Sequence, residues 1–199
     1  MEYHNPVLLN ECIQGLAIKP TGIYVDVTFG GGGHSKLILK NIDGGKLYAF
    51  DQDKNAHENA LSGDGFKLIN ANFRHLKNFL RMEGVRKIDG LLADLGVSSH
   101  QFDVAERGFS TRFDGELDMR MNTNSPLSAK QVVNEYGQQD LANILFKYAE
   151  LRNSRAIARE IVNAREIETI VTTNQLIDVV GHMVPEKNRN QFLARIFQA

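Results

Sequence analysis

The chain has 199 residues, of which 42% are hydrophobic and 24% are charged, with a formal net charge of −1. This composition excludes a disordered chain and a protein coated in basic residues. The sequence contains neither an apolar run approaching the roughly 18–20 residues of a membrane helix nor a secretory signal. Its single cysteine, Cys12, excludes an intrachain disulfide. We therefore expect a cytoplasmic protein without membrane contact, consisting of one domain or of a core with a smaller insert.

In the first half of the chain, short apolar runs alternate with helical patterns. Runs rich in β-branched and aromatic residues predict strands at 23–29, 46–51, 66–71 and 88–95. Helical patterns lie between them at 35–40, 54–61 and 73–83. Strands that alternate with helices form βαβ units, so the pattern predicts an α/β fold with a parallel, doubly wound sheet.

The second half of the chain has a different character. Residues 106–125 are rich in Gly, Asp and Arg and predict an irregular loop. Apolar residues then recur at helical spacing, among them Ala142, Leu145, Phe146 and Ala149. A further helix is expected to begin with Thr173 or Asn174 as its cap. No strand pattern returns, so we divide the chain into a core at 1–106 and a helical part at 107–199.

Four consecutive glycines, from Gly30 to Gly33, follow the first predicted strand. Glycines there let the backbone turn sharply and let a ligand approach the main chain, and ligands bind at the carboxyl ends of strands in doubly wound sheets. No Gly-Lys-Ser or Gly-Lys-Thr follows, which excludes a P-loop, and Ser35 replaces the third glycine of the dinucleotide motif G-x-G-x-x-G. A flexible surface loop is the alternative interpretation.

Asp51 closes the second predicted strand, about twenty residues after the glycines, as in dinucleotide-binding folds. A carboxylate in this place can accept hydrogen bonds from both ribose hydroxyls of a nucleoside cofactor. A surface aspartate at a strand end explains the residue alone equally well. Together, the glycines and the acid favour an adenosine-containing cofactor and leave both NAD and S-adenosylmethionine open.

Asp94 ends the fourth predicted strand and precedes Leu95-Gly96-Val97-Ser98-Ser99. Amino-methyltransferases commonly hold an acid or amide before a tight turn at this position. A carboxylate that accepts the hydrogens of a cytosine or adenine amine localises the nitrogen lone pair toward a methyl donor, and orientation then carries much of the catalysis. No metal is required. A turn-forming aspartate is the alternative.

Several longer blocks of sequence carry a family resemblance. They are residues 4–9, 26–35, 50–53, 94–101, 106–110 and 117–121. With these blocks the chain resembles the bacterial 16S ribosomal RNA (cytosine-N(4))-methyltransferases, the RsmH/MraW family. The resemblance implies S-adenosyl-L-methionine as cofactor, 16S RNA or the small ribosomal subunit as partner, and a Rossmann-like class I methyltransferase core with an all-helical RNA-recognition insert.

The resemblance also implies site residues. It assigns to Asp94 the catalytic position that faces the acceptor amine. The glycine pattern adds Gly30 to the residues that the resemblance places against the cofactor. Those residues are Gly32, Gly33, His34, Asp51, Phe73, Asp94 and Gln101.

Arginines are unevenly distributed, because residues 105–199 hold nine of the twelve in the chain. The planar guanidinium suits phosphates and base stacking. Arg152, Arg155 and Arg159 are predicted to share one helical face and to bind RNA, with a solvated charged face as the alternative. The other predicted RNA-binding residues, on the loop expected nearest the cofactor, are Arg107, Arg112 and Arg120.

Members of the family continue well past residue 199 and return to the core with further strands. We therefore expect an incomplete core with an exposed sheet edge, self-association with a homodimer as its simplest form, and no turnover by this chain alone. One alternative is an inactive RNA-binding fragment. A nicotinamide-dependent oxidoreductase is the other, disfavoured by Ser35 and by the lack of an obvious hydride-transfer acid/base pair.

Overall fold

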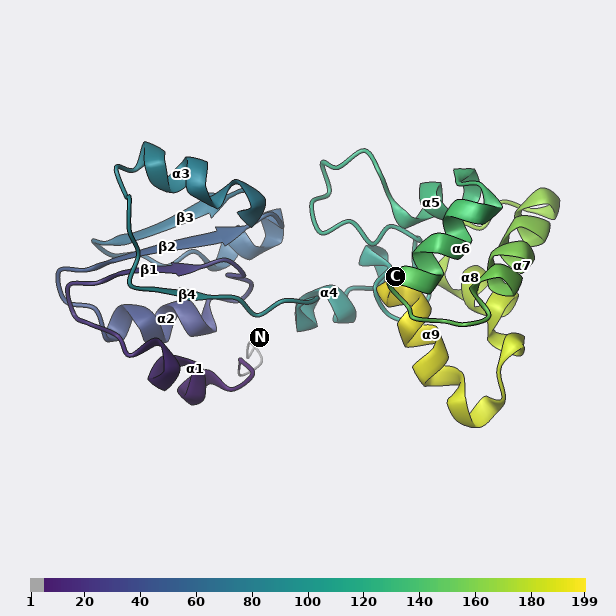
Figure 1. Ribbon diagram of the computed structural model, residues 1–199, viewed down its shortest axis with the longest axis horizontal. Coiled ribbons are helices and arrows are strands. Elements are labelled where there is room, and N and C mark those ends of the chain that lie inside the picture. The colour runs from purple at the N-terminus through teal and green to yellow at the C-terminus, as the bar shows by residue number, and fades with distance from the viewer. Residues whose placement is uncertain (1–5) are drawn as a thin grey trace. The chain divides into compact units, whose positions relative to one another are not determined.

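The structure is a computed structural model that describes residues 6–199 (Figure 1). Its contacts divide the chain into two compact units. The first comprises residues up to 96 together with 121–123, and the second comprises 97–120 and 124–199. The predicted boundary after residue 106 separates a methyltransferase core from a helical RNA-recognition insert. This assignment of roles to the two parts stays a prediction.

A sheet of four parallel strands, in the order β3-β2-β1-β4, forms the centre of the first unit. The chain places β2 and β3 on one side of β1 and then crosses to place β4 on the other side. The strand order therefore reverses between β1 and β4, and ligands of doubly wound folds bind outside the carboxyl ends of the strands at such a switch point. The strands are β1 (Ile23–Asp26), β2 (Lys46–Asp51), β3 (Phe66–Asn70) and β4 (Gly90–Leu92).

Helices cover both faces of this sheet (Figure 1). On one face, α1 (Leu9–Leu16) and α2 (Gly33–Lys40) pack over a cluster that includes Tyr24. On the other, α3 (Leu76–Met82) packs over a cluster that includes Val25. Neighbouring residues of β1 thus belong to opposite layers, as the strand pleat requires. The predicted doubly wound α/β fold, a part of a Rossmann-like core, is confirmed.

The elements of the first unit differ from the prediction in three details. β1 and β4 are shorter than their predicted ranges, and residues 54–61 form a 3-10 helix, Lys54–Asn59, in place of an α-helix. Helix α1 was not predicted. It begins after Leu8, whose φ is 50° and whose side chain makes no capping hydrogen bond, so the sequence lacks the usual start signal.

The regular elements of the second unit are helices, which confirms the predicted helical character. Their shared core contains the fully buried residues Leu117, Ile157 and Val180. In the described part of this unit, Glu116 and Thr172 form an isolated antiparallel β-bridge. The α-helices are α4 (Ser99–Asp103), α5 (Ala129–Glu135), α6 (Gln138–Lys147), α7 (Ser154–Ile167), α8 (Thr173–Val180) and α9 (Arg189–Gln198).

Three of these helices begin with the same capping box, Ser or Thr followed three residues later by Gln. The caps are Ser98 for α4, Ser128 for α5 and Thr172 for α8. The cap predicted at Thr173 or Asn174 was therefore wrong, because the Thr172 side chain accepts from the backbone N–H of Gln175. Among residues 6–199, no helix is long and apolar enough to cross a membrane.

Candidate functional site

The glycine loop joins β1 to α2 at the carboxyl end of the sheet. Gly30 and Gly32 have φ values of 51° and 75°, in the left-handed region that favours glycine. A Cβ atom at Gly32 would lie 2.8 Å from the Phe29 ring, whereas one at Gly30 would meet nothing within 4 Å. The main chain at Gly30 therefore borders open space, as a ligand-binding loop requires.

Asp26 ties the two ends of this loop together. Its Oδ1 accepts a hydrogen bond from the Thr28 backbone N–H at 3.1 Å, and its Oδ2 accepts one from the Ser35 hydroxyl at 2.7 Å. Burial raises the pKa of Asp26, against the opposing effect of these hydrogen bonds. Ser35, which replaces the third motif glycine, thus anchors α2 to β1. Asp26 was not predicted as a site residue, although a charged residue inside an apolar strand is a usable signal.

Asp51, at the end of β2, contacts the glycine loop directly. Its Oδ2 accepts the backbone N–H of Gly30 and its Oδ1 accepts that of Asp53, each at 2.8 Å. Burial raises the pKa of Asp51 despite these two bonds. A carboxylate offers about four acceptor positions, so two remain for further donors such as a ribose diol. Asp51 therefore lies where predicted, while its contact with a cofactor stays a prediction.

Asp94 follows β4 on the other side of β1. Its backbone N–H donates to the Thr28 hydroxyl at 2.8 Å, and the N–H of Val27 donates to the Leu92 carbonyl at 3.0 Å. The Asp94 side chain is exposed, and its carboxylate accepts no hydrogen bond from residues 6–199. The switch point thus places an available carboxylate beside the end of β1, the strand from which the glycine loop departs.

Phe73, His34 and Gly33 lie at this same end of the sheet in different surroundings. Phe73 opens the 3-10 turn after β3, and its side chain is 43% exposed. His34 is buried, with its Nε2 3.1 Å from the carbonyl oxygen of Val7. A Cβ at Gly33 would collide with Pro6. His34 and Gly33 thus hold the segment before α1 against the glycine loop, and cofactor contacts for all three residues stay predictions.

Gln101 belongs to the second unit. Its buried side chain closes the capping box of α4, where Oε1 accepts the backbone N–H of Ser98 at 3.1 Å. The side chain therefore fixes the start of a helix. A cofactor contact by Gln101 stays a prediction.

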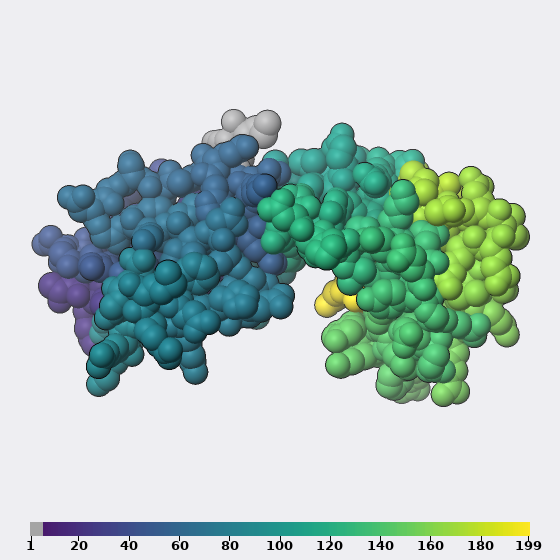
Figure 2. Space-filling model, turned by 90° about the horizontal axis from the view of Figure 1, so that it is seen from above, coloured from purple at the N-terminus to yellow at the C-terminus, as the bar shows by residue number. Residues whose placement is uncertain are grey.

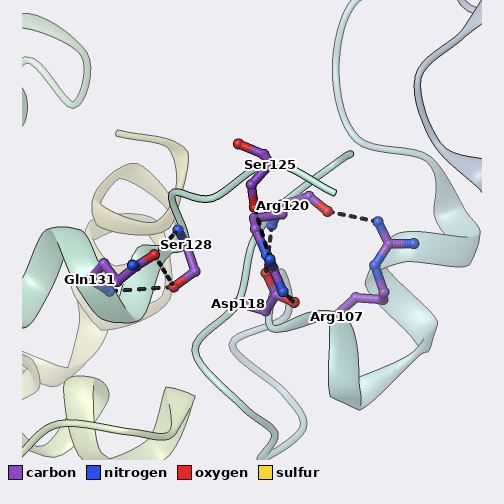
Figure 3. Close-up of polar contacts among 6 residues, drawn as sticks. All are labelled: Arg107, Asp118, Arg120, Ser125, Ser128 and Gln131. Carbon is purple, nitrogen blue, oxygen red and sulfur yellow. Dashed lines mark hydrogen bonds and ion pairs between the residues drawn. The ribbon is translucent and has the colours of Figure 1, made fainter. Parts of the chain in front are cut away.

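Two of the predicted RNA-binding arginines hold their own loop together (Figure 3). Arg107 is 6% exposed and donates from Nη2 to the backbone carbonyl of Arg120 at 2.9 Å. The Arg120 guanidinium forks onto both carboxylate oxygens of Asp118. Burial opposes ionisation of Asp118, but the hydrogen bonds from Arg120 outweigh it and lower the pKa. Arg112, by contrast, is exposed. RNA contacts stay a prediction for these three residues, and the geometry gives Arg107 and Arg120 a structural role.

The other predicted arginines lie around the start of α7. Arg155 and Arg159 are exposed and one turn apart on this helix. Arg152 is exposed but precedes the helix, which begins at Ser154. The prediction of one helical face for all three was therefore wrong. The physical reason is that Glu150, with a φ of 52°, turns the chain between α6 and α7.

Comparisons with known proteins give a consistent picture. The model of the MraW methylase family matches residues 1–199. A curated relative from Flavobacterium johnsoniae, named Ribosomal RNA small subunit methyltransferase H, is 60% identical over 100% of this chain and 66% of its own length. A relative of the same name from Christiangramia forsetii is 57% identical over 100% of this chain and 66% of its own length. Another from Phocaeicola vulgatus is 52% identical over 99% of this chain and 65% of its own length. The chain thus spans about two thirds of the length of these relatives.

Among solved structures, one named a methyltransferase from an antibiotic biosynthesis pathway of Anabaena variabilis is 15% identical. It covers 70% of this chain and 59% of its own, with a TM-score of 0.34. A likeness with this TM-score and identity shows neither the fold nor the function of the chain.

Proposed function

We propose, because the chain belongs to the MraW methylase family, that it carries the cofactor and catalytic residues of an S-adenosyl-L-methionine-dependent methyltransferase. The acceptor is the exocyclic N(4) amine of a cytidine in 16S ribosomal RNA; the name of the relatives supports small-subunit ribosomal RNA as the substrate, and the cytidine amine follows from the resemblance of the sequence blocks. The observation that carries the proposal is the hydrogen-bonded switch point. Asp51 binds the glycine loop on one side of β1, and Asp94 binds Thr28 on the other.

The residues of the switch point fit S-adenosyl-L-methionine. The open space beside Gly30 admits a ligand close to the main chain. The two remaining acceptor positions of Asp51 suit the ribose hydroxyls, and the exposed ring of Phe73 offers a stacking surface at the end of β3. When bound, the cofactor would supply a methyl group attached to a positively charged sulfonium sulfur. Loss of the methyl group would convert that sulfonium into a neutral thioether.

Asp94 prepares the acceptor. The lone pair of a cytosine amine is delocalised into the ring, and a carboxylate that accepts the amine hydrogens localises it on nitrogen. The Asp94 carboxylate then takes the proton that the amine loses as its N–C bond forms. Thr28 acts as a positioning residue, because its hydroxyl accepts the Asp94 backbone N–H and fixes the start of the turn. The target base is unpaired or flipped out, because enzymes that modify a base cannot reach its reacting atom inside a stacked duplex.

The assay of this proposal is transfer of a radiolabelled methyl group to isolated small-subunit RNA. Because the chain spans 66% of its Flavobacterium johnsoniae relative, the assay uses a chain extended by the remaining segment of that relative, alongside the 199-residue chain. Asp94→Ala should lower the rate by roughly 10²–10⁴, the usual effect of losing a positioned proton acceptor. Its affinity for S-adenosyl-L-methionine should fall less than its turnover.

The matched control is Asp64→Ala, which removes an exposed carboxylate from the loop before β3. This variant should keep the parental rate, and free cytidine should be a poor substrate. Turnover of Asp94→Ala within a factor of about two of the parent, far below the effect expected of a proton acceptor, rejects the assigned role. Binding of NAD in place of S-adenosyl-L-methionine in parallel calorimetry rejects the cofactor.

A further inference from the structure

The end of α6 exposes two aromatic side chains. Phe146 is 64% exposed and Tyr148 is 54% exposed, whereas Leu145 and Ala149 beside them are buried in the core of the second unit. Phe146 belongs to the apolar residues whose spacing predicts a helix, and the structure places its side chain at the surface. Figure 2 shows α6 and the turn after it, in green, at the surface of this unit. Residues two positions apart do not share a helix face, so the two rings do not form one surface, and the fold gives no role to the exposed Phe146 ring.

The groove beside Phe146 contains two basic side chains and one acidic side chain. Phe146 lines this open groove together with Asn143, Lys147, Glu150 and Arg152. The Nζ atom of Lys147 lies 5.0 Å from the centroid of the Tyr148 ring. One aromatic ring and two cations therefore line the same groove, which we call the α6 face and define as Asn143, Phe146, Lys147, Glu150 and Arg152.

The charge around the α6 face is opposite in sign to that of the whole chain. The groove is lined by two basic residues, Lys147 and Arg152, and one acidic residue, Glu150, a net of +1, against −1 for the chain. The single acid, Glu150, lies 3.7 Å from the guanidinium of Arg195, a further cation. An anionic ligand fits this distribution. Aromatic rings and arginine also occur at protein interfaces, so the positive charge of the groove is what favours an anionic ligand over a protein.

We propose that the α6 face binds an unpaired segment of RNA, with a base stacked on the Phe146 ring and the adjoining phosphates bound by Lys147 and Arg152. Exposed aromatic rings combined with a basic groove are the means by which proteins hold single strands. In a duplex both faces of each base are covered, so the occupant is single-stranded. The inference rests on the proposed function, because both take RNA as the ligand, and it assigns an RNA contact to the second unit.

The absence of tryptophan from the chain permits a direct test. Phe146→Trp places a single indole at the proposed stacking position. The control is Ile167→Trp, which places an indole at the end of α7 in the same unit, at a residue that is 89% exposed. Titration with an unstructured oligouridine should quench the indole fluorescence of Phe146→Trp and leave that of Ile167→Trp nearly unchanged. Duplex RNA should quench Phe146→Trp weakly. Absence of quenching by the single strand overturns the proposal, and that is also the result expected of a face that serves a protein.

Substitutions of Phe146 separate stacking from apolar bulk. Phe146→Ala and Phe146→Leu should weaken single-strand binding by about 5- to 150-fold, the effect of losing one stacked base. Phe146→Tyr keeps the ring and should bind like the parent. The residue is exposed, so each variant should keep the circular dichroism of the parent. Parental binding by Phe146→Leu, with its fold intact, contradicts a stacking role.

The fluorescence titration uses the 199-residue chain without cofactor, so it is independent of turnover. Quenching of the 199-residue Phe146→Trp variant by single strands, when the extended chain transfers no methyl group, supports the α6 face and rejects the catalytic proposal. Methyl transfer to RNA by a protein whose Phe146→Trp variant shows no quenching rejects the α6 face alone.

Discussion

The main chain at Gly30 borders open space at the carboxyl end of the sheet. Whether the cofactor occupies this space can be tested by comparing Gly30 with Gly84, a glycine of similar conformation elsewhere in the same unit. Gly30 and Gly84 have φ values of 51° and 74°, and a Cβ at either would meet nothing within 4 Å. Alanine at each position should therefore cost a similar ~1–2 kcal/mol of backbone strain. Gly84 lies between α3 and β4, at the opposite end of the sheet from the glycine loop.

Gly30→Ala should weaken S-adenosyl-L-methionine binding by about tenfold or more, because a loss of only ~1.4 kcal/mol produces that change. The added methyl group occupies space into which the ligand must come. Gly84→Ala should bind like the parent in the same calorimetric titration. Equal affinities for the two variants would remove Gly30 from the cofactor site.

Asp26 predicts a pH dependence of stability in the acid range. Burial raises its pKa above the ordinary 3.8, so the folded protein holds this proton to higher pH than the unfolded chain does. The contribution of Asp26 to the free energy of unfolding is therefore largest below pH 3.8 and is lost as pH rises through the raised value. Asp26→Asn keeps neutral partners for Thr28 and Ser35 and removes the titration. Relative to the parent, this variant should become more stable as pH increases over that window.

Urea unfolding at a series of pH values measures the difference in unfolding free energy between Asp26→Asn and the parent. The raised pKa of Asp51 acts in both proteins and so cancels from the comparison. A difference that stays constant across the acid range is incompatible with titration of Asp26.

The residues of the site could be predicted from sequence to different degrees. Asp51 and Asp94 lie where predicted, because Asp51 ends β2 and Asp94 follows β4, and both strands have a clear apolar pattern. The roles of Arg107 and Arg120 could not be read in the same way, since their partners include a backbone carbonyl and Asp118, which only the folded loop brings together.

At the scale of elements, strands were easier to predict than helix starts. The runs that form β2 and β3 are bounded by turn residues and rich in β-sheet formers, and their positions are confirmed. The start of α7 was missed because Glu150 adopts a left-handed conformation that the sequence does not mark with glycine. Three capping boxes were present in the sequence and would have located the starts of α4, α5 and α8.

The segment from the turn after α6 into α7 carries a prediction about salt. Replacing Arg152, Arg155 and Arg159 with Ala should weaken RNA binding and flatten its dependence on salt concentration. Each lost phosphate contact should change the logarithmic slope by about 1, or somewhat less on single strands. Lys187→Ala, which removes an exposed cation from another part of the same unit, is the control. Identical slopes for the triple variant and the parent would make this segment a solvated surface.

The whole molecule combines two units that each have a hydrophobic core of their own. The proposed chemistry belongs to the first unit, at the switch point of the sheet, and the proposed RNA-stacking face belongs to the second. β4 forms an edge of the sheet and its Leu91 is 43% exposed. An exposed apolar edge strand favours pairing with another chain, and self-association of the 199-residue chain stays a prediction.

Identification of the methylated nucleoside tests the central claim most directly. Small-subunit RNA is incubated with S-adenosyl-L-methionine and the extended chain, digested to nucleosides and analysed by mass spectrometry against the Asp94→Ala reaction. The account predicts a methyl group on N(4) of cytidine, at a level that falls with Asp94→Ala. A methyl group on any other atom, or N(4)-methylcytidine formed equally by both proteins, would contradict it.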